Sequence, residues 1–473
     1  MAIPQDDPLR CGLAWATKVV ASGVFITGRE PEDTFNFSCN WMAAPDALMR
    51  QVLETRDPAL LLSLPVNFDV DQARKRVHAE LDGRRATSGF FADQGCIVLD
   101  APDAVPAFEP VAVSPQPIAD DFEGVALPSR EAPASNGLNP DAISEAMDLA
   151  FADPMHFTNA MVVVHRGRII AERYREPYTQ DTRFESWSMG KSIAATLVGV
   201  AQRQGDLAID EADLFDEWRS PGDSRREIRL RDILNMASGL EFSGSFGKDE
   251  DHSVKSADGR FLDHIYVYGG GVDARAFCLA KPLQDPPGTA GRYRNCDPLL
   301  ATALVRDRVV DGRVADFLGW PQAQLYDRIG SKGMVLETDP AGLFLISGHD
   351  YGRARDWARL GQLYLQRGAW GGEQLLDDAF VDFVQTPATK AWAHNPYYGG
   401  FFCTNATGLL PGAPKDSYWM SGGGLQRTVI VPSRDLVIVR LGHMAGIVFG
   451  VEQALNASIA GLCDAVDRGG RAG

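Results

Sequence analysis

The apolar residues of the chain follow two repeat patterns, which place strands near the two ends of one region and helices around them. Four apolar, β-prone runs occur in two pairs, each separated by a short polar turn: 160–165 with 169–174, and 425–431 with 436–441. Such pairs are typical of antiparallel hairpins. Apolar residues recur at helical spacing in five longer segments: 142–151, 191–204, 298–309, 351–366 and 451–465. The order predicts one sheet that both ends of the region complete and that helices cover.

The first hundred residues have a different pattern and contain no catalytic motif. An apolar run covers 19–27, and apolar residues at helical spacing predict a helix over 69–81. Seven prolines between residues 101 and 136 then prevent regular structure, and Asn139 followed by Pro140 is typical of a helix start. We therefore divide the chain into an N-terminal region of unknown role, a proline-rich linker and a third domain, at 1–100, 101–138 and 139–473.

Composition and charge narrow the classes of function. With 473 residues, of which 45% are hydrophobic and 23% charged, the chain is globular and long enough for about two to four domains. Its net charge of −17 would repel a phosphate backbone, so we expect no nucleic-acid partner. No run reaches about 18 consecutive apolar residues, so we expect no membrane span. The start of the chain lacks a clear signal-peptide pattern, which leaves a cytoplasmic protein or an exported one with its signal peptide removed.

The seven cysteines and eight histidines show no spacing that is typical of a metal site. The odd number of cysteines and the absence of a C-x-x-C pair favour buried, reduced thiols. A bridge between Cys11 and Cys96 is the alternative if the protein is exported. We expect neither a metal nor a cofactor.

One motif indicates nucleophilic chemistry. Ser188-Met189-Gly190-Lys191 directly precedes the helical pattern of 191–204. Residues three apart on a helix lie on one face, so Lys191 can take the proton of the Ser188 hydroxyl if burial lowers the lysine pKa. The tetrad alone is a weak signal, because a helix-capping serine followed by a surface lysine gives the same letters. A second copy at 245–248 lies in a Gly-rich polar segment, and we interpret it as a solvated loop.

Two further segments provide the context that the tetrad needs. Tyr293-Arg294-Asn295 follows a Pro-Pro-Gly turn and precedes a helix start, so the phenol and the amide can point the same way. A phenol can share in proton transfer, and an amide can bind a lysine or a substrate carbonyl. The Gly-rich segment 421–426 precedes a predicted strand, where an exposed N–H can stabilise an oxyanion. Either segment alone is more readily explained by packing or by a plain turn.

Together the three segments resemble the serine β-lactamase and penicillin-binding-protein superfamily, in particular its class C-like branch that contains 6-aminohexanoate-dimer (nylon-oligomer) hydrolase and related esterases. The resemblance extends over about 139–465 and includes segments outside the motifs, namely 231–240, 285–300, 353–364 and 418–441. It implies an α/β fold of the α+β type, in which a five-stranded antiparallel sheet lies between helical layers, preceded here by an N-terminal extension.

The resemblance also implies roles for individual residues. Ser188 would be the acylated nucleophile, Lys191 its proton acceptor, and Tyr293 the acid and base that passes the proton to the leaving group. Asn295 would support Lys191. The oxyanion hole would combine the N–H of Ser188 with one from the Gly-rich turn, for which Gly424 and Leu425 are the expected residues.

One departure from the family pattern bears on the substrate. Many relatives begin the third motif with Lys or His, whereas this chain has glycines at the corresponding positions and no cation beside them. This difference argues against recognition of a β-lactam or a peptide carboxylate.

The expected function is therefore a cofactor-free serine hydrolase for a small-molecule amide or ester, and an amidase like 6-aminohexanoate-dimer hydrolase is the first choice. A short-chain carboxylesterase and a β-lactamase or D-amino-acid peptidase are alternatives within enzymes. A non-catalytic ligand-binding protein on the same fold is the alternative of another class. Residues 1–138 could cap the cleft, mediate a homodimer or brace the fold.

Overall fold

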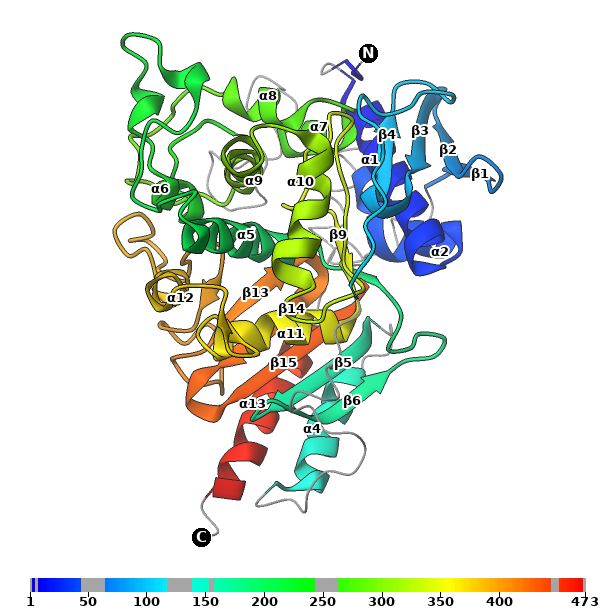
Figure 1. Ribbon diagram of the computed structural model, residues 1–473. Helices are drawn as coiled ribbons and strands as arrows, with labels where there is room; N and C mark the ends of the chain where they lie inside the picture. Colours follow the sequence, from blue (N-terminus) through cyan, green and yellow to red (C-terminus); the bar gives the residue numbers. More distant parts are fainter. Residues whose placement is uncertain are drawn as a thin grey trace.

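The computed structural model describes residues 2–4, 7–43, 64–116, 138–152, 157–242, 263–443 and 451–470. Figure 1 shows a central antiparallel sheet, a helical layer above it, and an N-terminal region beside that layer. The second Ser-x-x-Lys copy, at 245–248, lies outside the described residues.

The main sheet has six strands in the order β12-β13-β14-β15-β5-β6, and each neighbouring pair is antiparallel. Its strands are β5 (Thr158–His165), β6 (Arg168–Tyr174), β12 (Cys403–Thr404), β13 (Tyr418–Gly422), β14 (Gln426–Val431) and β15 (Leu436–Gly442). Both predicted hairpins are confirmed, and β15 pairs with β5 to join the two ends of the region. The strand beyond the five expected is β12, whose two residues are too few to form a recognisable pattern.

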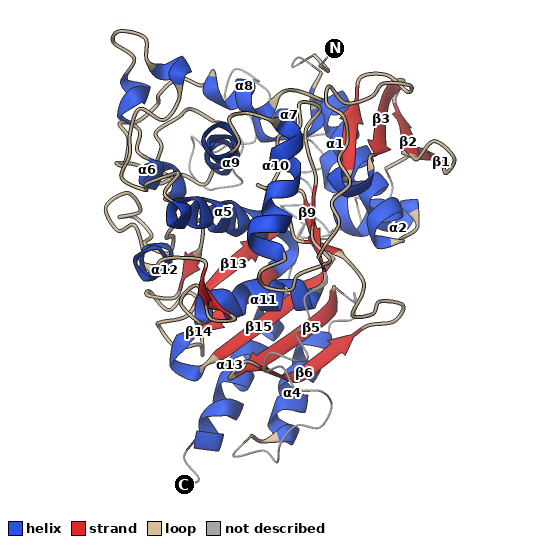
Figure 2. Cartoon of the chain, viewed as in Figure 1, coloured by secondary structure: helices blue, strands red, loops and turns tan. Residues whose placement is uncertain are grey.

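Helices cover both faces of this sheet (Figure 2). Helix α11 (Ala354–Leu365) packs on β14, β15 and β5, whereas α4 (Pro140–Phe151) packs on β5 and β6 and against α13 (Val451–Gly470). The other helices of this region are α5 (Gly190–Gln204), α6 (Leu230–Leu234), α7 (Asp263–Gly269), α8 (Ala274–Leu279), α9 (Cys296–Val309), α10 (Val314–Pro321) and α12 (Asp378–Gln385). A short hairpin joins β10 (Ala369–Trp370) to β11 (Glu373–Gln374).

Local signals explain most of the helix ends. The Asn139 side chain accepts hydrogen bonds from the first N–H groups of α4, and α5 ends at Gly205, whose φ of 89° favours glycine. Helix α11 begins later than the predicted residue 351, because Asp350–Gly352 forms a strand, β9. Strand β9 lies between β7 (Phe184–Glu185) and β8 (Val335–Leu336), and this pairing brings residue 350 beside the segment that precedes Ser188.

The N-terminal region combines α1 (Pro8–Ser22) and the short α2 (Pro31–Thr34) with a four-stranded antiparallel sheet. The strands are β1 (Asn67–Asp71), β2 (Arg76–Leu81), β3 (Arg84–Phe90) and β4 (Cys96–Leu99). The predicted helix over 69–81 is wrong, because β1 and β2 form a hairpin there. Val77, Ala79 and Leu81 are buried in alternation, which is the strand pattern, and β2 packs against α1. Helical spacing and strand alternation coincide at positions 77 and 81, and this coincidence produced the error.

The N-terminal region and the rest of the chain share one continuous hydrophobic core. Residues 101–116 of the predicted linker contain no helix or strand, and 117–137 lie outside the described residues.

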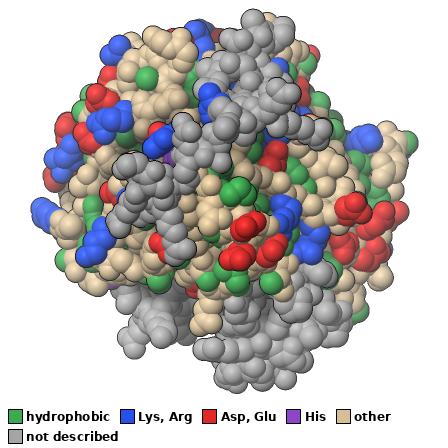
Figure 3. Space-filling view, turned by 90° about the horizontal axis from the view of Figure 1, so that it is seen from below, with side chains coloured by type: hydrophobic (Ala, Val, Ile, Leu, Met, Phe, Trp, Pro, Cys, Tyr) green, Lys and Arg blue, Asp and Glu red, His purple; other side chains and the backbone are tan. Residues whose placement is uncertain are grey.

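By length and composition, Leu9–Thr27 is apolar enough to cross a membrane, but 72% of its most apolar window is buried inside the fold. In the coloured part of Figure 3, acidic and basic side chains are interspersed and form no extended basic patch.

Candidate active site

Ser188 lies on a tight turn that leads directly into α5. The turn is a single 3-10 segment, Trp187–Met189, and Trp187 has a φ of 51°, which costs a non-glycine residue about 1–2 kcal/mol. Ser186 holds this conformation, because its N–H and its hydroxyl both donate to the Asp350 carbonyl, at 3.1 and 2.8 Å. Strand β13 closes the turn from the other side, since a Cβ at Gly422 would lie 2.0 Å from the Ser186 carbonyl oxygen. The position of Ser188 is therefore set by β9 and β13 together.

Lys191 lies in the first turn of α5, and its amine is hydrogen-bonded to the Ser188 hydroxyl. Its Nζ donates to Ser188 Oγ at 2.8 Å and to the Ser347 carbonyl at 2.5 Å. The side chain is fully buried, and burial lowers its pKa to about 7, although the nearby Asp350 acts in the opposite direction. A lysine of this kind is largely uncharged just above neutral pH and can accept the serine proton.

Asp350 is a buried carboxyl behind Lys191 that the sequence patterns do not reveal. It contacts the hydroxyl of Ser186, and a Cβ at Gly190 would lie 2.0 Å from Asp350 Oδ1. Burial raises the pKa of Asp350 well above its usual value. Gly190 in the Ser-x-x-Lys tetrad is therefore needed for the close approach of this carboxyl.

Tyr293 completes the group around the nucleophile. Lys191 Nζ lies 4.8 Å from the centre of the Tyr293 ring. Burial raises the pKa of Tyr293, and the interaction of its phenol with Ser188 opposes this effect only in part. The phenol thus stays protonated at neutral pH, which suits a proton donor rather than the first base. The structure brings together the three residue types that the sequence suggested for catalysis.

No hydrogen bond joins Asn295 to the lysine among the residues that the structure describes. Within the described part of the chain, the hydrogen-bond partners of Lys191 Nζ are Ser188 and Ser347, and Asn295 Oδ1 is buried without a partner. The support that was expected from Asn295 comes from the main chain at Ser347. A main-chain carbonyl can come from any residue type, so no sequence signal could have identified it.

A cavity of about 300 Å³ opens beside Ser188. It is lined by Ser188, Tyr293, Tyr397, Tyr398, Phe401, Cys403, Ser421, Gly422 and Gly423. Four of these side chains are aromatic, and none of the described lining side chains is charged. The cavity suits an uncharged, flat or aliphatic group.

The residues of the Gly-rich turn that line this cavity precede the two residues that we expected there. Gly422 and Gly423 line it, whereas Gly424 and Leu425 are absent from its described lining. The Gly424 carbonyl accepts a hydrogen bond from Arg440 at 2.5 Å, and Leu425 packs against Phe157. The residues of the turn that reach the cavity beside Ser188 are therefore Gly422 and Gly423.

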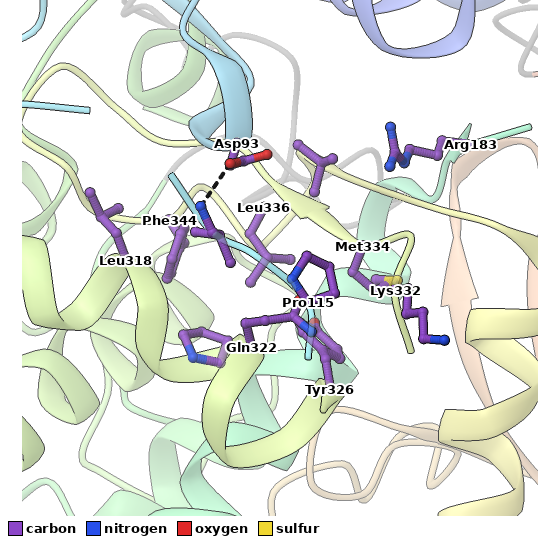
Figure 4. A pocket seen from close by; sticks show the side chains of 13 residues that line it. Asp93, Pro115, Arg183, Leu318, Gln322, Tyr326, Lys332, Met334, Leu336 and Phe344 are labelled. Carbon is purple, nitrogen blue, oxygen red and sulfur yellow. Dashed lines mark hydrogen bonds between the residues drawn. The ribbon is translucent and has the colours of Figure 1, made fainter. Parts of the chain in front are cut away.

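A second, smaller cavity of about 90 Å³ lies apart from the catalytic residues (Figure 4). Arg183 and Lys332 stand at one side of it, and apolar side chains such as Leu318 and Phe344 lie at the other. All seven cysteines are buried and none forms a disulfide bond, as the sequence favoured. Within the described ranges, no three His, Cys, Asp or Glu side chains are grouped so that they could hold a metal.

Comparison with known proteins gives a consistent picture. The family model described as Beta-lactamase matches residues 150–447. A 6-aminohexanoate-dimer hydrolase of Paenarthrobacter ureafaciens is 23% identical over 331 residues, which cover 63% of this chain and 79% of that protein.

Many solved structures have a similar fold, and two of them serve as examples. A penicillin-binding-protein homologue from Caulobacter crescentus aligns with a TM-score of 0.53 at 16% identity, over 69% of this chain and 97% of the other. A family VIII carboxylesterase aligns with a TM-score of 0.51 at 15% identity, over 68% and 97% of the two chains.

Proposed function

Because the chain belongs to the beta-lactamase family, whose members are serine hydrolases, we propose that it hydrolyses a small, uncharged amide through an acyl-enzyme on Ser188. One observation carries the proposal: the fully buried Lys191 amine, with a pKa of about 7, lies 2.8 Å from Ser188 Oγ. A serine hydroxyl becomes a good nucleophile only when such a base removes its proton.

Acylation follows from the positions of the three side chains. Neutral Lys191 takes the hydroxyl proton while Ser188 Oγ attacks the substrate carbonyl carbon. The negative charge that forms on the carbonyl oxygen is stabilised by the N–H groups of Ser188 and Gly423, and each donor lowers the barrier by about 3–4 kcal/mol. Tyr293 gives its proton to the leaving amine, and the Lys191 ammonium then returns a proton to the phenolate.

Deacylation uses the same groups in the reverse order. A water molecule enters where the amine has left, and neutral Lys191 accepts its proton, directly or through the Tyr293 hydroxyl, as the water attacks the acyl carbon. The carboxyl of Asp350 takes no direct part, because it lies behind Lys191 against Ser186 and Gly190 and does not line the cavity. Collapse of the intermediate returns the proton to Ser188 Oγ and releases the acid.

The cavity supports the choice of substrate. Its described walls are aromatic and carry no cation, which favours an uncharged acyl group over a β-lactam or peptide carboxylate. The relative from Paenarthrobacter is named for the 6-aminohexanoate dimer, a linear amide with an amino group at one end and a carboxylate at the other. From this relative we take the linear amide as our first candidate, and from the described cavity walls we take the preference for uncharged groups. A short-chain ester is the second, because the same uncharged walls suit an ester and one structural relative is a carboxylesterase. Since the family consists of serine hydrolases, a purely ligand-binding role is not retained.

A substrate panel tests the proposal. Wild type and Ser188→Ala are compared on anilides and p-nitrophenyl esters of matched acyl chains, with and without a terminal carboxylate. We expect turnover by the wild type alone and a preference for the uncharged members. Equal or faster turnover of the carboxylate-bearing members would contradict the inference from the cavity walls.

A further inference from the structure

Helix α1 of the N-terminal region contacts the segment that binds the catalytic lysine. We propose that Trp15 and Lys18 of α1 are positioning residues, which act through His349 and Glu337 to hold the main chain at Ser347 on Lys191. The inference rests on the function proposed above, because it assigns to the N-terminal region a part in preparing the base.

A buried ion pair forms the first link. Lys18 and Glu337 are both fully buried, and Lys18 Nζ lies 2.5 Å from Glu337 Oε2. Glu337 Oε1 accepts hydrogen bonds from the Ser22 hydroxyl at 2.6 Å and from the Cys96 N–H at 2.7 Å. Burial alone would raise the pKa of Glu337, but Lys18 and His349 outweigh it and hold that pKa below its usual value. Groups of the N-terminal region thus surround a carboxylate that belongs to the hydrolase domain.

His349 forms the second link, and its two ring nitrogens have different partners. Nε2 accepts a hydrogen bond from Trp15 Nε1 at 2.7 Å, and Nδ1 lies 3.4 Å from Glu337 Oε2. Burial, with the charge of Lys18, lowers the pKa of His349 to about 4, so the ring is neutral at pH 7. The proton must then be on Nδ1, because Nε2 is occupied as an acceptor. Trp15 therefore fixes both the orientation and the tautomer of His349.

Main-chain hydrogen bonds connect Glu337 and His349 to the segment whose carbonyl binds the lysine. Glu337 and His349 are paired by a hydrogen bond from the Glu337 N–H to the His349 carbonyl at 3.0 Å, and the His349 N–H donates to Leu345 at 2.9 Å. Ser347 lies inside this closed segment, and its carbonyl accepts from Lys191 Nζ at 2.5 Å. The Ser347 hydroxyl is also 2.5 Å from the Tyr268 hydroxyl. A shift of the segment would move the carbonyl that holds the amine.

Trp15 also packs directly against the walls of the site. Its ring lies 5.1 Å from that of Tyr268 and 6.4 Å from that of Trp187, which precedes the nucleophile. The contact between α1 and α7 is close, because a Cβ at Gly269 would lie 2.0 Å from the Cys11 carbonyl oxygen. Such packing leaves little room for α1 to move without moving its neighbours.

Several charged or titratable side chains of the surrounding elements bear on the network and are needed to interpret a pH profile. They are Lys18, Glu185, Lys191, Tyr268, Glu337, His349, Asp350 and Tyr351. Lys191 has a pKa of about 7 and is the titratable group whose amine contacts Ser188 Oγ, so we assign the acid limb near pH 7 to Lys191.

The test replaces Trp15 by phenylalanine in the full-length protein, which removes the N–H donor and keeps most of the ring. Trp218→Phe is the matched control, because Trp218 is also fully buried and donates to a main-chain carbonyl, that of Leu279 at 3.1 Å. Two quantities are measured for each variant: the pH profile of kcat/KM, and hydrogen–deuterium exchange of the peptide that covers 343–350.

We expect Trp15→Phe to speed exchange in 343–350 by about fivefold or more. Looser contact and added water around Lys191 should raise its pKa and move the acid limb of the profile upward by about half a pH unit or more. The control should show neither change. A Trp15→Phe protein that only loses thermal stability, as the control does, would overturn the inference.

A second pair of variants covers the case in which Trp15→Phe does not fold. His349→Gln keeps one donor and one acceptor and should retain the wild-type profile, whereas His349→Leu keeps neither and should behave as described for Trp15→Phe. Equal behaviour of the two would overturn the inference. A wild type that hydrolyses no panel substrate and takes no serine label would instead refute the proposed function, and the exchange data would still decide whether α1 holds the segment.

Discussion

Replacing Lys191 by methionine should lower kcat/KM by about 10² to 10⁴, because the variant loses its general base while keeping a side chain of similar length. Burial moves the lysine pKa from 10.5 to about 7, which corresponds to a destabilisation of the ammonium form by about 5 kcal/mol relative to a lysine in water. About half of the wild-type molecules would then be active at pH 7, and about one tenth at pH 6. The wild-type rate should therefore rise about tenfold per pH unit below neutrality and level off above about pH 8.

The assay is the initial rate of ester hydrolysis between pH 5 and 9, corrected for the spontaneous reaction. Lys332→Met is the control. Lys332 is a partly exposed lysine that lines the second cavity, so this substitution makes the same chemical change at a site away from Ser188. We expect the acid limb in wild type and Lys332→Met, and its loss in Lys191→Met. A wild-type rate that still rises steeply between pH 8 and 9 would show an ordinary lysine pKa and refute the role of burial in preparing this base.

Two further substitutions test other parts of the site. Tyr293→Phe should lower kcat about 10²-fold. The loss should be larger for amides than for activated esters, because a poor leaving group needs the proton of the phenol most. An equal loss of kcat on both substrates would show that Tyr293 does not protonate the leaving group. Gly422→Ala should lower both activity and the free energy of unfolding, by about 1–3 kcal/mol, since its Cβ would meet the Ser186 carbonyl oxygen at 2.0 Å. Gly319→Ala, where a Cβ would meet nothing within 4 Å, should be neutral or stabilising by denaturant unfolding.

Much of the fold follows from local patterns. The two hairpins of the main sheet could be predicted because β14 and β15 are buried along their whole length and appear as short apolar runs with polar turns between them. Helix α4 could be placed because Asn139 and Pro140 give a start signal independent of the rest of the fold. Short elements are different: β9 and β12 have three and two residues, and their pairing depends on distant segments.

The candidate site shows the same division. Ser188 and Lys191 are three residues apart across the start of α5, so their contact is local and could be predicted. The hydrogen bonds from Lys18 to Glu337 and from Trp15 to His349 join residues 319 and 334 positions apart, and no spacing rule relates them. The exact N–H of the oxyanion hole depends on the path of the Gly-rich turn, where glycines without side chains leave the register ambiguous.

The division of the chain at 100 and 138 stays a prediction. The region 1–100 has strands and helices of its own, but α1 shares the continuous core and a buried ion pair with the rest of the chain. Of the roles considered for this region, bracing the fold is the one that the contacts of Lys18 favour.

The measurement that tests the central claim most directly is the mass of the intact protein after reaction with a fluorophosphonate, which forms a bond from an activated serine Oγ to phosphorus and releases fluoride. Wild type, Ser188→Ala and Ser245→Ala are compared, with folding of each checked by thermal unfolding. We predict one label on wild type and on Ser245→Ala, and none on Ser188→Ala. A label that persists in Ser188→Ala, or a folded wild type that takes none, would contradict the assignment of Ser188 as the nucleophile.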